Sequence, residues 1–171
     1  MEWNEIVSYA WWAFAFRWLH VIAGIMWIGH LWYFNFTQTP TMPKIPNELK
    51  PGVSGYILPE ALFWFRWGAM ATIVTGLILA WMMGTLGNTL KIGIGDHNAH
   101  FTSIGIGMWL GAIMWANVWF IIWPNQKKNI GLVQVTPDEK KKAARIAGLA
   151  SRVNTMLSIP MLYGMTSVHF Y

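Results

Sequence analysis

The chain has 171 residues, of which 55% are hydrophobic and only 11% are charged. Soluble domains have roughly 25% charged residues, so the composition indicates an integral membrane protein. Thirteen tryptophans agree with this interpretation, because indole rings favour the membrane interface. The absence of cysteine excludes disulfides, Cys-ligated zinc, iron–sulfur clusters and covalently attached c-type haem.

Four segments along the chain are long and apolar enough to cross a bilayer, which takes roughly 20 residues. They cover about residues 10–36, 61–83, 101–123 and 146–171. The start of the chain lacks the positive charge of a signal peptide, so the first segment is expected to stay in the mature protein. We predict a single all-α integral membrane domain, a four-transmembrane-helix bundle.

Proline is expected to interrupt the helices, because it donates no backbone hydrogen bond and its ring clashes with the preceding turn. Five prolines therefore predict a loop without continuous helix between the first two spans: Pro40, Pro43, Pro46, Pro51 and Pro59. Pro124 is expected to end the third span.

The distribution of basic residues predicts the orientation, because Lys and Arg in short loops stay on the cytoplasmic side. Residues 37–60 and 124–145 carry eight Lys or Arg residues, whereas the N-terminus and residues 84–100 carry only Lys91. Both termini should therefore be outside, in the periplasm if the membrane is a bacterial inner membrane. The net charge of +5 is explained by topology, so no nucleic-acid partner is expected.

The first span contains Arg17, His20 and His30. An ionisable residue inside a span costs about 2.5 to 3.5 kcal/mol on insertion scales and usually faces a partner. Ten residues separate the two histidines, which places them roughly 80° apart around a helix and about 15 Å apart along it. They are not expected to ligate one centre.

A haem b held between helices needs an axial imidazole, small residues beside the macrocycle, aromatic walls and a cation for the propionates. We predict His20 as an axial ligand of haem b, with His169 at the end of the fourth span as the favoured second ligand. Further residues of the first span are expected to support the group: Arg17, Ala23, Gly24 and Trp27. In the alternative interpretation, His20 only hydrogen-bonds a neighbouring helix.

A second metal site is an alternative at the outer end of the third span. His97 and His100 share a helix face if this span begins slightly early, and Asp96 and His169 could complete a shell of nitrogen and oxygen ligands. Such a shell suits zinc or copper. Histidines in an outer loop are also commonly solvated.

Polar residues also occupy the inner half of the spans: His30, Asn35, Arg66, Asn117, Arg152 and Asn154. The arginines are expected to extend to the cytoplasmic interface, and the asparagines to hydrogen-bond between helices. A second ligand pocket is the alternative. Four glycines are predicted to lie at close helix contacts or beside a cofactor: Gly24, Gly76, Gly107 and Gly111.

Four stretches carry a family resemblance: Arg17-Trp-Leu-His-Val-Ile-Ala-Gly-Ile-Met-Trp-Ile-Gly29, Phe65-Arg-Trp-Gly68, Asn117-Val-Trp-Phe-Ile-Ile-Trp-Pro-Asn-Gln-Lys127, and Arg152-Val-Asn-Thr-Met-Leu-Ser-Ile-Pro-Met-Leu162 with His169. They resemble the membrane domain of the urate oxidase N-terminal family, the family of the membrane-bound urate hydroxylase. His20 and His169 match histidines of the family's first and last motifs, whereas His30 stands where a small residue is expected. Larger members have more membrane helices and a C-terminal cytochrome c domain, so this chain resembles a short form.

These observations lead to three functional hypotheses. The first is a haem-b-binding membrane protein that transfers electrons or serves as an accessory subunit of a larger membrane oxidoreductase complex, with other membrane subunits or a redox partner. The second is a non-catalytic structural subunit whose Trp-rich surface packs against neighbouring chains. The third, implied by the resemblance alone, is an oxidoreductase like the urate hydroxylase, and the sequence identifies no polar purine pocket for it.

Overall fold

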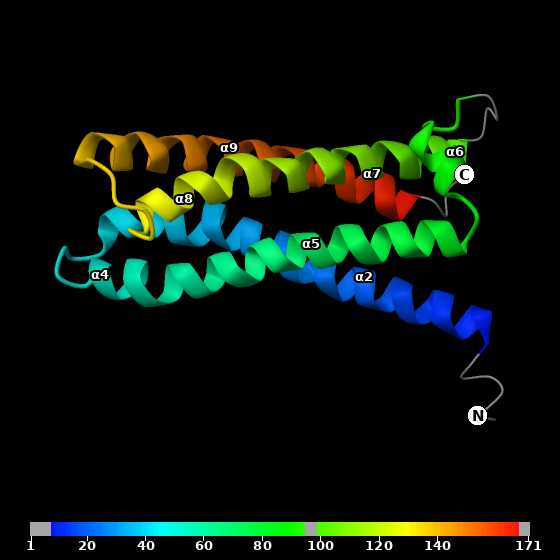
Figure 1. Ribbon diagram of the computed structural model, residues 1–171, viewed down its shortest axis with the longest axis horizontal. Helices are drawn as coiled ribbons and strands as arrows, with labels where there is room; N and C mark the ends of the chain where they lie inside the picture. Colours follow the sequence, from blue (N-terminus) through cyan, green and yellow to red (C-terminus); the bar gives the residue numbers. More distant parts are fainter. Residues whose placement is uncertain (1–7, 95–98, 168–171) are drawn as a thin grey trace.

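The computed structural model describes residues 8–94 and 99–167, and all regular secondary structure within these ranges is helical. The long helices run roughly along one axis and form an elongated bundle (Figure 1). They pack as two pairs, α2 (Tyr9–Trp32) with α5 (Leu58–Met82) and α7 (Ala99–Asn117) with α9 (Pro137–Thr166).

The first helical segment is longer than predicted. α2 begins after Ser8, whose side chain accepts a hydrogen bond from the backbone N–H of Trp11 and so caps the helix. The helix continues through the π-helix η1 (Tyr33–Gln38), α3 (Thr39–Thr41) and the 3-10 turn η2 (Met42–Lys44). The helical segment therefore continues beyond residue 36, the predicted end of the first span.

The other long helices are also composite. The second consists of α4 (Lys50–Gly52), the π-helix η3 (Val53–Ile57) and α5, and the short helix α6 (Leu86–Leu90) follows it. The third consists of α7, the π-helix η4 (Val118–Ile122) and α8 (Trp123–Asn129). Gly84 and Gly131, which follow the second and third long helices, have φ of 67° and 83°, a conformation that glycine adopts without strain.

The prediction that proline would interrupt the helices is wrong at Pro40, Pro59 and Pro124, which all lie inside continuous helical segments. Each follows a π-helix by two residues. The residue before each proline donates its backbone N–H to the carbonyl five residues earlier, as in Thr39 to Phe34. The wider turn leaves room for the proline ring. The hydrogen bond from the preceding residue continues the helix at the point where proline has no N–H to donate.

Three of the helical segments are long and apolar enough to cross a membrane: Tyr9–Lys44, Lys50–Met82 and Ala99–Asn129. α9 is 30 residues long but is not among them; it begins with the charged run Pro-Asp-Glu-Lys-Lys-Lys and carries Ser151, Arg152 and Asn154 further along. An all-helical fold with helices able to span a membrane is confirmed for the described residues. The predicted count of four spans is not.

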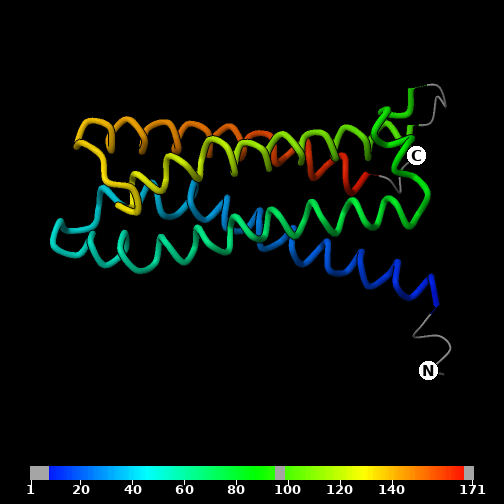
Figure 2. The backbone as a smooth tube through the Cα atoms, viewed as in Figure 1, coloured from blue at the N-terminus to red at the C-terminus, as the bar shows by residue number. Residues whose placement is uncertain are grey.

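The two helix pairs meet around a core of apolar side chains. Six of the larger core side chains are at most 2% exposed: Trp27, Leu31, Phe65, Met114, Val118 and Ile122. α2 crosses the bundle obliquely, so that its later residues reach α9 while its Tyr9 end lies beyond α5 (Figure 2). The hydrogen bond from Trp32 Nε1 to Ser158 Oγ, 3.0 Å, joins α2 to α9 where they meet.

The two ends of the bundle differ. The start of α2, the end of α9 and α6 lie at one end, and the connections 45–49 and 130–136 lie at the other (Figure 1). This agrees with the predicted grouping of the two basic loops. The outer faces expose many large apolar side chains, among them Ile25, Trp81 and Phe120, as lipid contact requires.

The predicted close contacts are present at Gly107 and Gly76 but not at Gly111. A Cβ on Gly107 would lie 3.2 Å from the carbonyl oxygen of Met161, and one on Gly76 would lie 2.8 Å from Cε1 of His20. Gly24 is a looser contact, 4.0 Å from Cγ2 of Thr72. Gly111 is buried, but a Cβ there would meet nothing within 4 Å.

Candidate functional site

His20 lies at the contact between α2 and α5. Its Nδ1 is 2.9 Å from the carbonyl oxygen of Thr72 and 3.4 Å from Oγ1 of Thr75. The imidazole ring fits against Gly76, where any side chain would collide with it. The sequence pattern of small residues on α5 therefore positions the histidine.

The Thr72 contact sets the tautomer of His20. A carbonyl oxygen only accepts, so Nδ1 donates its proton and the neutral ring keeps a lone pair on Nε2. Among the described residues, Nε2 makes no hydrogen bond. A histidine that donates one ring N–H to a carbonyl and presents the other nitrogen has the arrangement usual for a metal ligand.

The residues predicted to surround a haem at His20 have other contacts. Ala23 is buried and Gly24 faces Thr72, so the small residues bring α2 close to α5 and a macrocycle would need another side of His20. Trp27 is 1% exposed within the apolar core. Arg17 is exposed, with Nη2 3.5 Å from the sulfur of Met83.

Three predicted metal ligands, Asp96, His97 and His169, lie outside the described residues. His100, the second residue of α7, is half-buried and its ring contacts Phe101 edge-on. Within residues 8–94 and 99–167 no group of three or more His, Cys, Asp or Glu residues is placed to hold a metal ion. The haem ligands and the alternative zinc or copper set therefore stay predictions.

His30 lies further along α2 than His20, beside a groove that His20 does not line. Its Nδ1 is 2.7 Å from the carbonyl oxygen of Met26, so Nδ1 donates this bond as well. The ring borders a groove of about 440 Å³ between α2 and the start of α5: Ile25, Met26, Gly29, His30, Tyr33, Ile57 and Ala61 line it. The two histidines are not brought together, as their spacing predicts.

The predicted role of the asparagines as hydrogen bonds between helices is confirmed. Asn154 is fully buried on α9 and donates to the carbonyl of Met114, 3.0 Å away. Asn117 donates to Oδ1 of Asn154 at 2.7 Å and to the carbonyl of Ala150 at 3.0 Å. Asn35 donates to Oγ of Ser151 at 2.8 Å. These bonds join η1, α7 and α9.

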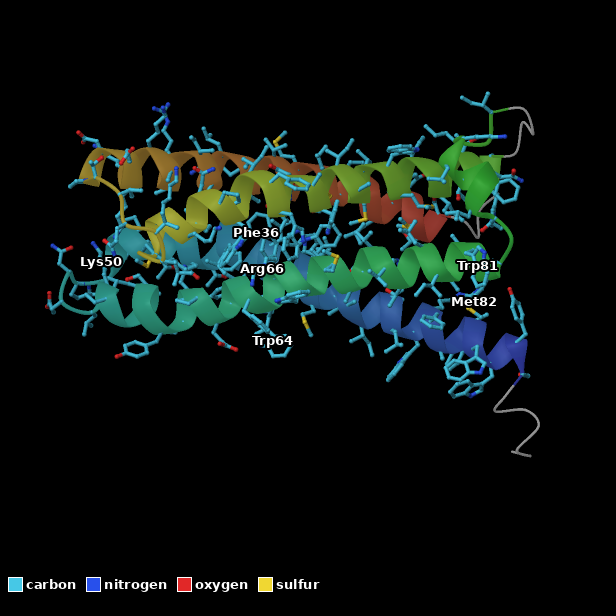
Figure 3. All side chains as sticks on the ribbon, viewed as in Figure 1. Phe36, Lys50, Trp64, Arg66, Trp81 and Met82 are labelled. Carbon is cyan, nitrogen blue, oxygen red and sulfur yellow. The ribbon has the colours of Figure 1, made fainter. Side chains whose placement is uncertain are left out.

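Arg66 is half-buried, and its guanidinium packs against tryptophan rings. Its guanidinium carbon is 3.7 Å from the ring centre of Trp123, 5.4 Å from that of Trp119 and 5.9 Å from that of Trp67. The side chain lies in the middle of the bundle (Figure 3). Sequence reasoning missed this cluster, although the i, i+4 spacing of Trp119 and Trp123 places both on one helix face.

The fold and these polar contacts define a class: a helical protein with helices long and apolar enough to span a membrane, which carry ionisable residues among them. Within that class, residues 94–171 match the family model described as urate oxidase N-terminal. The match confirms the resemblance for the part that holds α7, η4, α8 and α9, whereas the motifs at 17–29 and 65–68 lie outside it. Comparison with curated proteins and with solved structures gives no match.

Proposed function

We propose that the chain crosses a bacterial inner membrane four times, with both termini periplasmic, and binds haem b as an electron-transfer or accessory subunit of a membrane oxidoreductase. α9 supplies the fourth span. It packs along α7, and its polar side chains, such as Ser151 and Asn154, are hydrogen-bonded to the other helices. The match to the urate oxidase N-terminal family supports an oxidative setting.

The observation that carries the haem proposal is the hydrogen bond of His20 to Thr72. It fixes the ring orientation, makes Nε2 the free nitrogen and raises its basicity as a ligand. Gly76 admits the ring at the α2–α5 contact. Haem b supplies one-electron chemistry when bound.

The other residues have supporting roles in this proposal. Arg17 lies one turn from His20 toward the Tyr9 end and is exposed, so a propionate can replace its contact with the sulfur of Met83. His169 is proposed as the second axial ligand. The donor set fits an iron ligand at His20, while Ala23 and Gly24 are filled by helix packing and so do not wall the macrocycle.

The test is an absorption spectrum of the detergent-purified chain, produced with haem supplied. We expect a Soret band that His20→Ala abolishes. His30→Ala is the matched control, because His30 is also a span histidine with Nδ1 bonded to a carbonyl, and it should leave the band intact. The double variant His97→Ala with His100→Ala should also retain it. A colourless wild-type chain would refute haem binding.

A second candidate is a purely structural membrane subunit. It is favoured by the exposed tryptophans on the outer faces, among them Trp18, Trp64, Trp81 and Trp109, which suit contact with lipid or with neighbouring chains. A colourless chain that co-purifies in fixed ratio with other membrane subunits would establish this function. The family match keeps urate hydroxylation as a third candidate, and oxygen uptake on addition of urate tests it directly.

A further inference from the structure

Buried polar atoms without a hydrogen-bond partner are mostly donors in the described part of the chain. Five are N–H groups and one is an acceptor: Trp27 Nε1, Arg66 Nε, Arg66 Nη1, Trp115 Nε1 and Trp119 Nε1, against Gln38 Oε1. Buried donors are almost always paired in folded proteins, so a cluster of unpaired ones requires an explanation. Three of the five belong to the contacting pair Arg66 and Trp119.

Arg66 shares its aromatic partner with a second cation. Lys127 Nζ lies 5.9 Å from the ring centre of Trp123, the same indole on which the Arg66 guanidinium stacks at 3.7 Å. Two positive charges from different helices, α5 and α8, therefore converge on one side chain. Like charges repel, so an anion between or beside them stabilises the arrangement.

The protein supplies no such anion within the described residues. No carboxylate pairs with Arg66 there, and Glu60, the acidic residue of α5, accepts a hydrogen bond from Trp64 Nε1 at 3.0 Å. The indole faces attract the guanidinium, but they accept none of its N–H groups in the plane. An arginine inside an apolar helix usually has a partner, so the missing partner is a bound group.

The depth of the cluster indicates the kind of anion. Trp123 is one helical turn, about 6 Å, from Lys127, and Lys127 is followed by Lys128 at the bundle end that carries both basic connections. Tryptophan and lysine in this order mark the boundary between hydrocarbon and headgroups. A lipid phosphate at this boundary meets Lys127 first, and Arg66 lies deeper, on the face of Trp123.

We propose that Arg66, Trp119, Trp123 and Lys127 bind the phosphate of an anionic phospholipid between α5 and α8. Arginine recognises phosphate through two parallel N–H groups, and basic pockets between membrane helices bind anionic headgroups. Nη2 is not one of the buried, unpaired atoms, so the phosphate contact is placed at Nη2. The proposal requires membrane insertion but does not depend on haem.

The test measures lipid binding by native mass spectrometry of the full chain, taken from vesicles of phosphatidylcholine with increasing phosphatidylglycerol. We expect wild type to retain phosphatidylglycerol selectively. Arg66→Gln should weaken this binding at least tenfold and Lys127→Gln several-fold, while Arg66→Lys should retain part of it. Arg152→Gln, which changes an exposed arginine on α9, is the matched control and should stay within twofold of wild type.

Folding and the source of the phosphate are controlled separately. The helical circular dichroism of each variant identifies any variant that fails to fold. If Arg66→Gln fails to fold, Lys127→Gln still tests the site, because Lys127 lies outside the apolar core. Phosphatidylglycerol binding at wild-type strength in the folded variants would refute the site. Inorganic phosphate is therefore added to the chain in pure phosphatidylcholine. If it raises the thermal stability of the protein as much as phosphatidylglycerol does, the lipid assignment is refuted.

Discussion

Single residues decide how closely α7 and α9 approach each other. A Cβ on Gly164 would lie 2.8 Å from the carbonyl oxygen of Ser103 and 3.0 Å from the backbone nitrogen of Gly107. These are backbone atoms of a packed helix, which cannot move aside as the end of a flexible side chain can. The two glycines thus allow direct backbone contact, as small residues do in membrane helix interfaces.

We therefore predict that Gly164→Ala lowers the stability by about 1 to 3 kcal/mol, the usual cost of overpacking. The measurement is the thermal unfolding of the purified chain in detergent. Gly111→Ala on α7 is the control, because its Cβ would meet nothing within 4 Å. Equal thermal stability of the two variants would contradict the close backbone contact.

At the scale of elements, the π-helices allow proline inside membrane-spanning helices. η1, η3 and η4 each end two residues before a proline, and the helix then continues. Pro160 lies within α9 without such a segment before it, so the wide turn is one solution and not a requirement. Composition alone predicts a break at these prolines, because the local preference of the backbone for a π turn depends on the packing around it.

The start of α9 has a pH-dependent cap. Glu139 accepts hydrogen bonds from the backbone N–H and the hydroxyl of Thr136, at 2.9 and 3.0 Å, and the Thr136 hydroxyl accepts one from the Glu139 backbone N–H at 3.3 Å. These bonds stabilise the carboxylate and hold the pKa of Glu139 below its ordinary value of 4.5. Because the folded-state pKa is lowered, the stabilisation is present above 4.5 and is lost as the pH falls through the lowered value.

We predict that the first turn of α9 frays as the pH falls through this range, seen as faster amide hydrogen exchange at residues 137–140 after correction for the intrinsic pH dependence of exchange. Glu139→Gln should remove the pH dependence, because glutamine forms the same capping box without titrating. An identical acid response in wild type and Glu139→Gln would assign the effect to another group.

The whole molecule groups its connections by charge. The start of α2 and the end of α9 lie at one end of the bundle. The connections flanked by Lys44, Lys50, Lys127 and Lys128 lie at the other (Figure 1). Because basic residues stay on the cytoplasmic side, this end should face the cytoplasm.

We predict that a reporter fused after Tyr171 is active only outside the cytoplasm, and that the same reporter inserted at residues 130–136 is active only inside it. The pair of fusions tests the orientation and, independently, whether α9 crosses the membrane. Activity of both reporters on the same side would show that α9 lies along the surface and would remove the fourth span.

The sequence by itself determines the properties that depend on local composition. Apolar runs of spanning length predict the helices, and eight basic residues against one predict how the connections are grouped, because insertion into a bilayer is governed by transfer of each segment from water. The roles of Asn117 and Asn154 also follow, since an amide inside a membrane helix must be paired. The i, i+10 spacing of the two histidines predicts that they do not ligate one centre.

Only the tertiary structure decides which residues far apart in the chain come together. It places His20 against Thr72 and Gly76 on α5, and it encloses Arg66 with Trp119 and Trp123 from another helix. Such contacts depend on the rotation and crossing of packed helices, and here the helices are composite and pass through proline by π turns. A helix that is apolar on nearly all sides carries little information about which face meets which neighbour, so packing between small residues and polar pairs settles it.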